Sequence, residues 1–352
     1  MSVLHFDKHT NSFLLGVAGN LYQLCENRAK LLVKCGEVPD PGEKGEPVKK
    51  GEKAPRAEGP AYITGVATCG GCVAVISNNK VVETFDGDFQ RVASTVAIKR
   101  PTSVQVTDKN VVISDKAGDA YSYNTDLTDR KYLLGHVSVV MDMVLSPDLQ
   151  FLVTCDRDEK IRISHFPNCY NIHSYLLGHQ EYVLKVLLLS PNLLVSVGGD
   201  QKVILWDLGT RKPLQTLNSP QDDYITVSYT EPYLLACNTR HVTVYKLTDN
   251  TLAQTSQLVT DHDIVDIATS DAHVALLTRE PKLELYQFSG GVLSGKIEVE
   301  GEIDLSQCKD SALPEKKKVV RTAGFAEYFE RKRKRIEEEN LKEESKQAHL
   351  KG

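Results

Sequence analysis

The chain has 352 residues, a formal net charge of −5 and a hydrophobic fraction of 41%, which is enough for one large repeat domain or two ordinary domains. No run approaches the roughly 18 apolar residues of a membrane span, and the N-terminus lacks the basic and apolar regions of a secretory signal, so we expect neither a membrane partner nor secretion. The eight scattered cysteines suit reduced thiols better than a disulfide framework.

Charge is unevenly distributed along the chain. The last segment, 315–352, holds 12 Lys and Arg against 8 Glu, a formal +4, which leaves −9 for the rest. Because phosphate binding needs a basic surface, the acidic body excludes a general nucleic-acid platform. Any RNA contact should come from a small patch, from the tail or through a partner.

Short apolar strands that end in an aromatic residue recur through most of the chain. The candidate third strands of successive repeats are 21–24, 82–85, 121–123, 161–163, 205–206, 244–245 and 285–286. One marker residue per repeat gives the period: the interval from Tyr22 to Phe85 is 63 residues, and the following intervals lie between 38 and 42, with the later markers at Tyr123, Ser164, Trp206, Tyr245 and Tyr286. A period near 40 residues predicts seven repeats of a radial β-architecture.

The long first interval contains the segment 35–60, which is rich in Gly, Pro, Lys and Glu. Such a composition buries too little apolar surface to order itself. We therefore predict a flexible insertion between the first and second repeats.

The fifth repeat carries the features of a WD repeat. In such repeats a His, a Ser or Thr, a turn Asp and the Trp form a hydrogen-bond chain inside the blade. The fifth repeat has the full set, His179, Ser196, Asp200 and Trp206. We predict that these residues are structural, and that they are neither metal ligands nor an acid–base pair.

The fourth repeat keeps part of this set. It has His136, Thr154 and Asp158, but Ser164 stands in place of the Trp. The stretch 156–162 also packs six charged residues into seven positions, which is unusual for a strand between two blades. This charge indicates a surface role.

These patterns predict an all-β fold, a seven-bladed WD-repeat β-propeller over 1–305 with a C-terminal helical tail over 315–352. We expect the N-terminal strand, 2–6, to close the ring by joining the last blade.

Aromatic and basic residues mark the predicted tail helix. Phe325, Tyr328, Phe329 and Ile336 recur at helical spacing on one face. A basic run follows the aromatic residues, Arg331, Lys332, Arg333, Lys334 and Arg335. Three aromatics on one face need a surface to cover, and we expect them to anchor the helix on the propeller or on the partner, which leaves the basic run near RNA.

No motif for catalysis or for cofactor binding is present. GxGxxG, GxSxG, P-loop and HExxH patterns are all missing. Cys69 and Cys72 form a lone CxxC without a second ligand pair, as a zinc site would need. We therefore predict an interaction scaffold with no catalytic, cofactor-binding or metal-binding residues of its own.

The third to fifth repeats resemble one WD-repeat family, the non-catalytic subunit of tRNA (guanine-N(7)-)-methyltransferase, called Wuho in insects. The resemblance rests on the stretches 115–122, 134–138, 146–148 and 156–162. It implies a heterodimer whose catalytic subunit binds S-adenosylmethionine and methylates a guanine in the tRNA variable loop. Nuclear localisation is also expected, with cytoplasmic presence left open.

A mixed-charge patch on the third and fourth repeats is the predicted partner-binding site. Its members are Lys116, Arg157, Asp158, Glu159, Lys160 and Arg162. Ile161 and Ile163 should face the core, so we expect Arg162 to point the other way and keep its guanidinium near the surface, where it can pair with a partner carboxylate. WD repeats often carry Arg or Lys at this position, so a purely structural role is the alternative for Arg162.

An adaptor of a ubiquitin-ligase or other multiprotein complex is the alternative. Such an adaptor would carry an exposed Arg shortly after a Trp-Asp pair, and Gly209 stands at that place. A catalytic function is the third and least favoured hypothesis.

Overall fold

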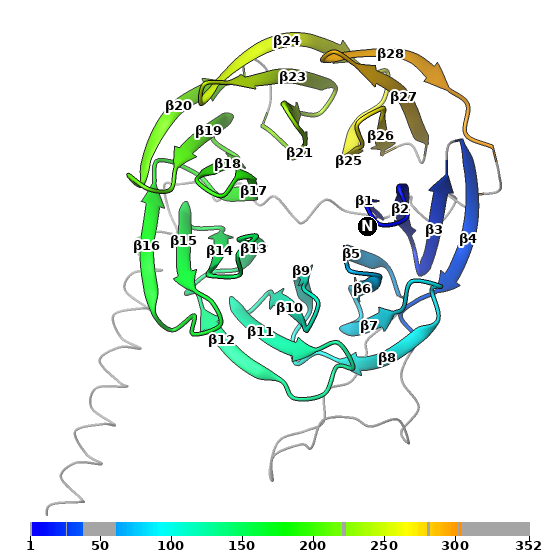
Figure 1. The fold of residues 1–352 in the computed structure, drawn as a ribbon, viewed down its shortest axis with the longest axis vertical. Helices are drawn as coiled ribbons and strands as arrows, with labels where there is room; N and C mark the ends of the chain where they lie inside the picture. Colours follow the sequence, from blue (N-terminus) through cyan, green and yellow to red (C-terminus); the bar gives the residue numbers. More distant parts are fainter. Residues whose placement is uncertain are drawn as a thin grey trace, which may run out of the picture. The chain divides into compact units, whose positions relative to one another are not determined.

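The computed structural model describes residues 2–25, 27–37, 61–219, 223–279, 282–300 and 303. These residues form seven four-stranded antiparallel sheets arranged as blades around a central axis (Figure 1). The predicted seven-bladed propeller is therefore confirmed. No helix occurs in these described ranges, and accordingly none of them holds a helix long and apolar enough to cross a membrane.

Each blade consists of four strands consecutive in the sequence. Blade one comprises β1 (Ser2–Asp7), β2 (Ser12–Val17), β3 (Asn20–Cys25) and β4 (Arg28–Lys34). Blade two comprises β5 (Ile63–Cys69), β6 (Cys72–Ser77), β7 (Val81–Phe85) and β8 (Arg91–Val96). Blade three comprises β9 (Pro101–Val106), β10 (Asn110–Asp115), β11 (Asp119–Asn124) and β12 (Lys131–Gly135). Blade four comprises β13 (Val140–Leu145), β14 (Phe151–Asp156), β15 (Lys160–His165) and β16 (Ile172–Leu177).

The remaining three blades follow the same plan. Blade five comprises β17 (Val183–Ser190), β18 (Leu193–Gly198), β19 (Lys202–Asp207) and β20 (Lys212–Asn218). Blade six comprises β21 (Thr226–Thr230), β22 (Tyr233–Cys237), β23 (His241–Thr248) and β24 (Thr251–Val259). Blade seven comprises β25 (Ile264–Thr269), β26 (His273–Thr278), β27 (Leu283–Ser289) and β28 (Val292–Ile297). The first strand of each blade lies innermost and the fourth forms the outer rim (Figure 1).

Apolar residues on both faces of each blade form the core. Seven buried clusters exist, one at each junction between neighbouring blades, and the junction of blades seven and one has its own cluster. The middle strands are therefore covered on both faces, so successive residues of these strands are buried whichever way they point. In β14, for example, the five residues from Leu152 to Asp156 are all buried.

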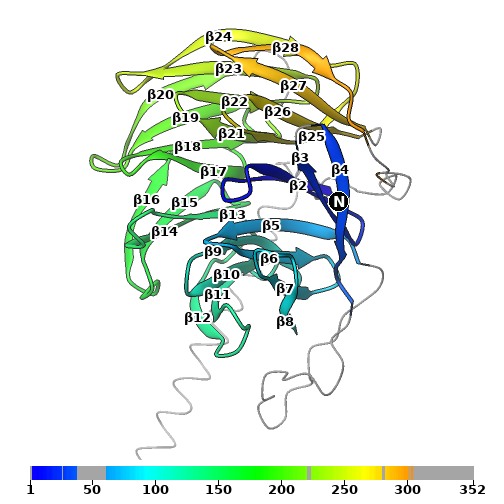
Figure 2. The ribbon, with the colours of Figure 1, turned by 45° about the vertical axis from the view of Figure 1, so that its right-hand side comes forward.

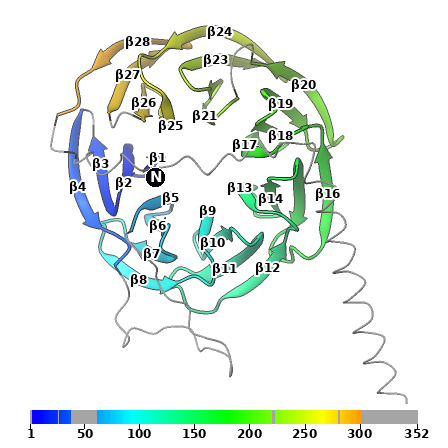
Figure 3. The same cartoon turned by 180° about the vertical axis from the view of Figure 1, so that it is seen from behind.

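The predicted closing strand is wrong. β1 pairs with β2 inside blade one and takes no part in the sheet of blade seven. The ring closes instead where the chain leaves β28 and runs beside β4, as Figure 2 and Figure 3 show. There the amide of Ala29 donates to the Glu300 carbonyl at 2.7 Å and the amide of Glu300 donates to the Asn27 carbonyl at 2.6 Å. The sequence spacing did not reveal this, because a strand can pair with either neighbour in a ring.

Most of the predicted insertion and all of the predicted tail lie outside the described residues. The chain divides into two units, Met1–Ser311 and Ala312–Gly352, and all described residues belong to the first. Of 35–60 only Cys35, Gly36 and Glu37 are described, and the aromatic and basic residues from Phe325 to Arg335 are not.

Candidate partner-binding site on blades three and four

Blade five contains a complete hydrogen-bond chain. His179 contacts Asp200 through Nδ1 at 2.9 Å and Ser196 Oγ through Nε2 at 2.7 Å, and Trp206 Nε1 donates to the same hydroxyl at 2.8 Å. All four side chains are withdrawn from solvent. These hydrogen bonds tie the loop between blades four and five to blade five. Because all four side chains are buried, they offer no reactive group to a ligand.

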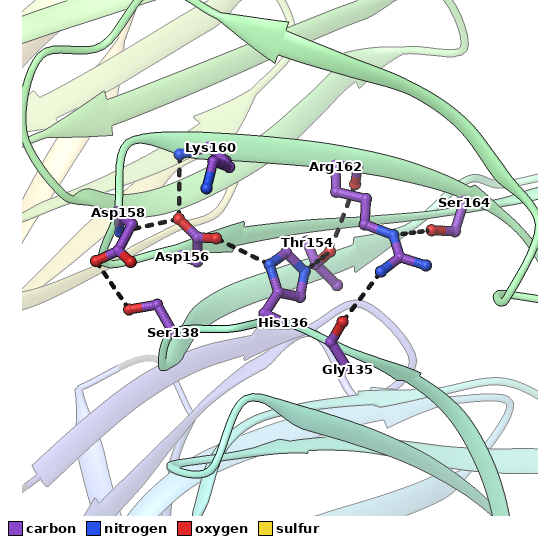
Figure 4. Close-up of polar contacts among 9 residues, drawn as sticks. All are labelled: Gly135, His136, Ser138, Thr154, Asp156, Asp158, Lys160, Arg162 and Ser164. Atoms are coloured by element: carbon purple, nitrogen blue, oxygen red, sulfur yellow. Dashed lines mark hydrogen bonds and ion pairs between the residues drawn. The ribbon is translucent and has the colours of Figure 1, made fainter. Parts of the chain in front are cut away.

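Blade four differs from the sequence prediction in its carboxylate. His136 Nδ1 lies 2.9 Å from Asp156 Oδ2, and its Nε2 lies 2.8 Å from the Thr154 hydroxyl (Figure 4). Asp158, the predicted member, instead accepts a hydrogen bond from Ser138 at 3.0 Å. The position of Asp156 in the hairpin explains why it replaces Asp158 as the partner of His136. Asp156 ends β14, and it also accepts hydrogen bonds from the amides of Asp158 and Lys160, which caps the turn.

His136 and His179 each help to lower the pKa of the aspartate they contact, Asp156 and Asp200. Burial alone would raise the pKa of Asp156, but His136 together with the amides of Lys160 and Asp158 outweighs this effect, and the pKa of Asp156 is lowered. The pKa of Asp200 is lowered in the same way, burial being opposed by His179. Both groups therefore favour the ionised form in the folded protein.

The prediction that Arg162 exposes its guanidinium is wrong. Arg162 is only 6% exposed. Its Nε donates to Ser164 Oγ at 2.8 Å and its Nη1 to the Gly135 carbonyl at 3.1 Å (Figure 4). Its Nη2 donates to the Cys169 carbonyl at 2.7 Å. The side chain does point away from the face of Ile161 and Ile163, but that second face is also buried between blades.

Arg162 in blade four and Trp206 in blade five both contact the Gly-His loop that precedes their blade. Trp206 packs so closely on Gly178 that an added Cβ there would lie 2.8 Å from the ring. In blade four, Ser164 replaces the Trp, and Arg162 donates to the carbonyl of Gly135, the glycine of the equivalent Gly-His pair. Arg162 is thus a structural residue that holds the loops on both sides of the hairpin.

The other predicted patch residues lie at the surface. Lys116, Arg157, Glu159 and Lys160 are exposed, and Asp158 is half-buried. They sit in two equivalent turns, between β10 and β11 and between β14 and β15. The loop from His136 to Val139 joins these turns, because the amide of His136 donates to the Gly118 carbonyl at 2.8 Å and Val139 accepts from the Arg157 amide at 3.1 Å. The two charged turns therefore form one continuous surface with this loop.

Apolar residues beside the charged turns were missed by the sequence analysis. Tyr132 is 61% exposed, Val137 70%, Tyr175 43% and Leu177 68%. Leu177 and Tyr175 on β16 stand opposite Lys160 and Arg162 in the register of blade four. The sequence did hold a signal for them: an exposed edge strand usually carries polar or charged residues, so apolar residues on an outer strand are unusual.

The CxxC pair is part of a hairpin. Cys69 and Cys72 pair across a two-residue turn formed by Gly70 and Gly71, both with positive φ. Burial raises the pKa of both thiols, and Asp108 adds to the rise at Cys69. Among the residues that the structure describes, no group of three or more His, Cys, Asp or Glu is placed to hold a metal.

Comparison with known proteins gives one family match. Residues 123–303 match the family model described as the tRNA methyltransferase TRM82 WD40 domain. A solved structure described as "Crystal Structure of Mitotic Checkpoint Complex" shares the fold, with a TM-score of 0.67 at 13% identity over 81% of this chain and 86% of that one.

Several curated relatives carry one functional name, tRNA (guanine-N(7)-)-methyltransferase non-catalytic subunit. The wuho protein of Drosophila mojavensis is 44% identical over 32% of this chain and 30% of its own length. TRM82 of Saccharomyces cerevisiae (strain RM11-1a) is 39% identical over 39% and 31%, and wdr4 of Dictyostelium discoideum is 35% identical over 34% and 31%. The chain thus spans about three-tenths of the length of these relatives.

Proposed function

Because this chain belongs to the tRNA methyltransferase TRM82 WD40 domain family, we propose that it is the non-catalytic subunit of a tRNA (guanine-N(7)-)-methyltransferase. In this proposal the propeller binds the catalytic subunit and stabilises it for methylation of a variable-loop guanine. S-adenosylmethionine belongs to the catalytic subunit, and tRNA is reached mainly through the complex, since the body of the chain is acidic.

The observation that carries this proposal is the surface on blades three and four, within and beside the matched region. It combines exposed cations, Lys116, Arg157 and Lys160, with the exposed apolar side chains of Val137 and Leu177. Such a surface fits a partner with apolar anchors rimmed by carboxylates, because apolar contacts supply affinity and charge sets orientation and on-rate. The buried Arg162 positions this surface by holding its loops and does not itself face the partner.

An adaptor of a ubiquitin-ligase or other multiprotein complex is not favoured. The curated relatives reported above are all named as methyltransferase subunits. Co-purification separates the two functions, since an adaptor would bring down ligase components in place of a methyltransferase.

The test is the affinity of the 352-residue chain for the catalytic tRNA (guanine-N(7)-)-methyltransferase subunit, measured by calorimetry at ~0.15 M salt. We expect the triple variant K116E/R157E/K160E to bind at least about tenfold more weakly, because rim charges of the wrong sign repel the partner. The matched control is K30E/K34E/K246E, which reverses three exposed lysines on blades one and six.

Two outcomes are distinguished. If the unmodified chain does not bind the catalytic subunit, the proposed function is wrong. If it binds but both triple variants weaken binding equally, the function stands and the assignment of the surface is wrong.

A further inference from the structure

The junction between blades seven and one is where the chain begins and ends its circuit, and no strand is shared across it. A propeller closed in this way depends on contacts between complete blades. The outer contact is the pairing of Glu300 with the edge of β4. An inner contact lies on the innermost strands, where β1 meets β25.

Besides the apolar cluster at this junction, the inner contact includes one buried carboxylate, Asp266 on β25. Its Oδ2 accepts the backbone amide of Leu4 in blade one at 2.9 Å, and its Oδ1 accepts the hydroxyl of Thr226 in blade six at 3.2 Å. A single side chain therefore joins three consecutive blades, six, seven and one. Burial raises the pKa of Asp266, whereas Lys185 and the hydrogen bonds from Leu4 and Thr226 oppose this rise and favour the ionised form. Hydrogen bonds to the ionised form are stronger than those to a neutral acceptor.

The same arrangement occurs once more, away from the junction. Asp142 on β13 accepts the backbone amide of Val186 in blade five at 3.3 Å through Oδ2 and the hydroxyl of Ser103 in blade three at 2.8 Å through Oδ1. Each Asp follows a register shift at the corresponding place of its innermost strand. In both, the amide comes from the next blade and the hydroxyl from the previous one.

Lys185 connects the two carboxylates electrostatically. It lies on β17, the innermost strand of blade five. The carboxylate of Asp142 raises the pKa of Lys185, burial opposes the rise, and Asp266 adds to it. Its ammonium charge thus offsets the cost of placing two carboxylates near the axis of the ring.

We propose that Asp266 closes the ring on its inner side, as the pairing of Glu300 with β4 does on its outer side. Asp266 joins blades six, seven and one by hydrogen bonds of the kind with which Asp142 joins blades three, four and five. The first and last blades are then held like neighbours that follow each other in the chain. The clasp replaces the strand exchange that the N-terminal strand does not make.

Hydrogen–deuterium exchange of the 352-residue chain tests this closure, with D266A and D142A as a matched pair. Loss of a hydrogen bond to a charged acceptor should raise amide exchange in β1 of D266A by about 10- to 100-fold while β17 stays near the unmodified rate. D142A should show the reverse, with faster exchange in β17 and an unchanged β1.

The proposal is overturned if β1 exchanges normally in D266A, or if D142A accelerates β1 as much as D266A does. Should D266A not fold, D266N with D142N gives the same regional comparison, because Asn keeps the shape of the side chain and only one acceptor oxygen. If β1 exchanges at the same rate in D266N as in D142N, the proposal is likewise overturned.

Discussion

Arg162 shows how a single residue in a propeller blade changes its role with burial. Its guanidinium donates to one hydroxyl and two backbone carbonyls, and substitution by Leu removes all three donors. Buried acceptors left without donors cost about 1–3 kcal/mol each, so R162L, which strands three of them, should lower the free energy of unfolding by about 3 kcal/mol or more. Thermal unfolding of the chain alone measures this loss.

The control for R162L is K160L, which replaces an exposed neighbour on the same strand. It should change stability by about 0.5 kcal/mol or less. If R162L keeps a normal melting temperature and yet abolishes partner binding, Arg162 acts as a surface contact and its structural role is refuted.

Asp200 makes the stability contributed by the hydrogen bonds of blade five depend on pH. Its pKa is lowered in the folded protein, because His179 and the Gln180 amide outweigh the effect of burial. A lowered pKa contributes stability above the unfolded value of about 3.9, and this stability is lost as pH falls through the folded value. D200N should therefore melt at a lower temperature at pH 7 and lose less stability between about pH 5 and 3 than the unmodified chain.

Substitution of an exposed carboxylate serves as the comparison for Asp200. D261N, in the loop before blade seven, should leave the melting temperature at pH 7 nearly unchanged. A D200N variant whose acid profile parallels that of the unmodified chain would show that Asp200 carries no such linkage.

At the scale of elements, the outer strands β12 and β16 carry the apolar part of the proposed interface. Tyr132 and Leu177 are exposed, so the double variant Y132S/L177S should fold normally. Loss of two apolar anchors should weaken binding of the catalytic subunit by about tenfold or more. V259S/V292S changes two exposed apolar residues on the outer strands of blades six and seven and should bind normally. Equal weakening in both variants would refute the placement of the interface.

The C-terminal tail remains a prediction from sequence. Arg331 to Arg335 provide five consecutive cations, beyond the described residues. If they contact RNA, reversing their charge should weaken tRNA binding by the complex and flatten the dependence of its affinity on salt, because fewer counterions are released. An unchanged salt slope would rule out the contact between this basic run and RNA.

At the scale of the whole molecule, the propeller is proposed to act without a cofactor of its own. The sequence contains no glycine-rich cofactor loop. The isolated chain should therefore neither bind S-adenosylmethionine nor methylate tRNA, whereas the complex with the catalytic subunit should do both. Calorimetry that detected micromolar binding of the cofactor by the lone chain would contradict this division of labour.

The sequence by itself determined the number and kind of repeats. Each predicted third strand, from 21–24 to 285–286, lies in the third strand of a blade. This worked because a radial repeat forces the same alternation of apolar residues and turns on every blade. The exposed turns of Lys116 and of Arg157 to Lys160 were equally readable, since a tight hairpin places its turn residues at the surface.

Only the tertiary structure decided the burial of Arg162, the partner of His136 and the closure of the ring. Alternation along a strand says which side chains share a face, but it does not say that neighbouring blades cover both faces. Asp156 and Asp158 are two residues apart, so the hairpin geometry had to choose between them. Asp266 and Leu4 are 262 residues apart, and no local pattern encodes a contact that exists only because seven blades complete a circle.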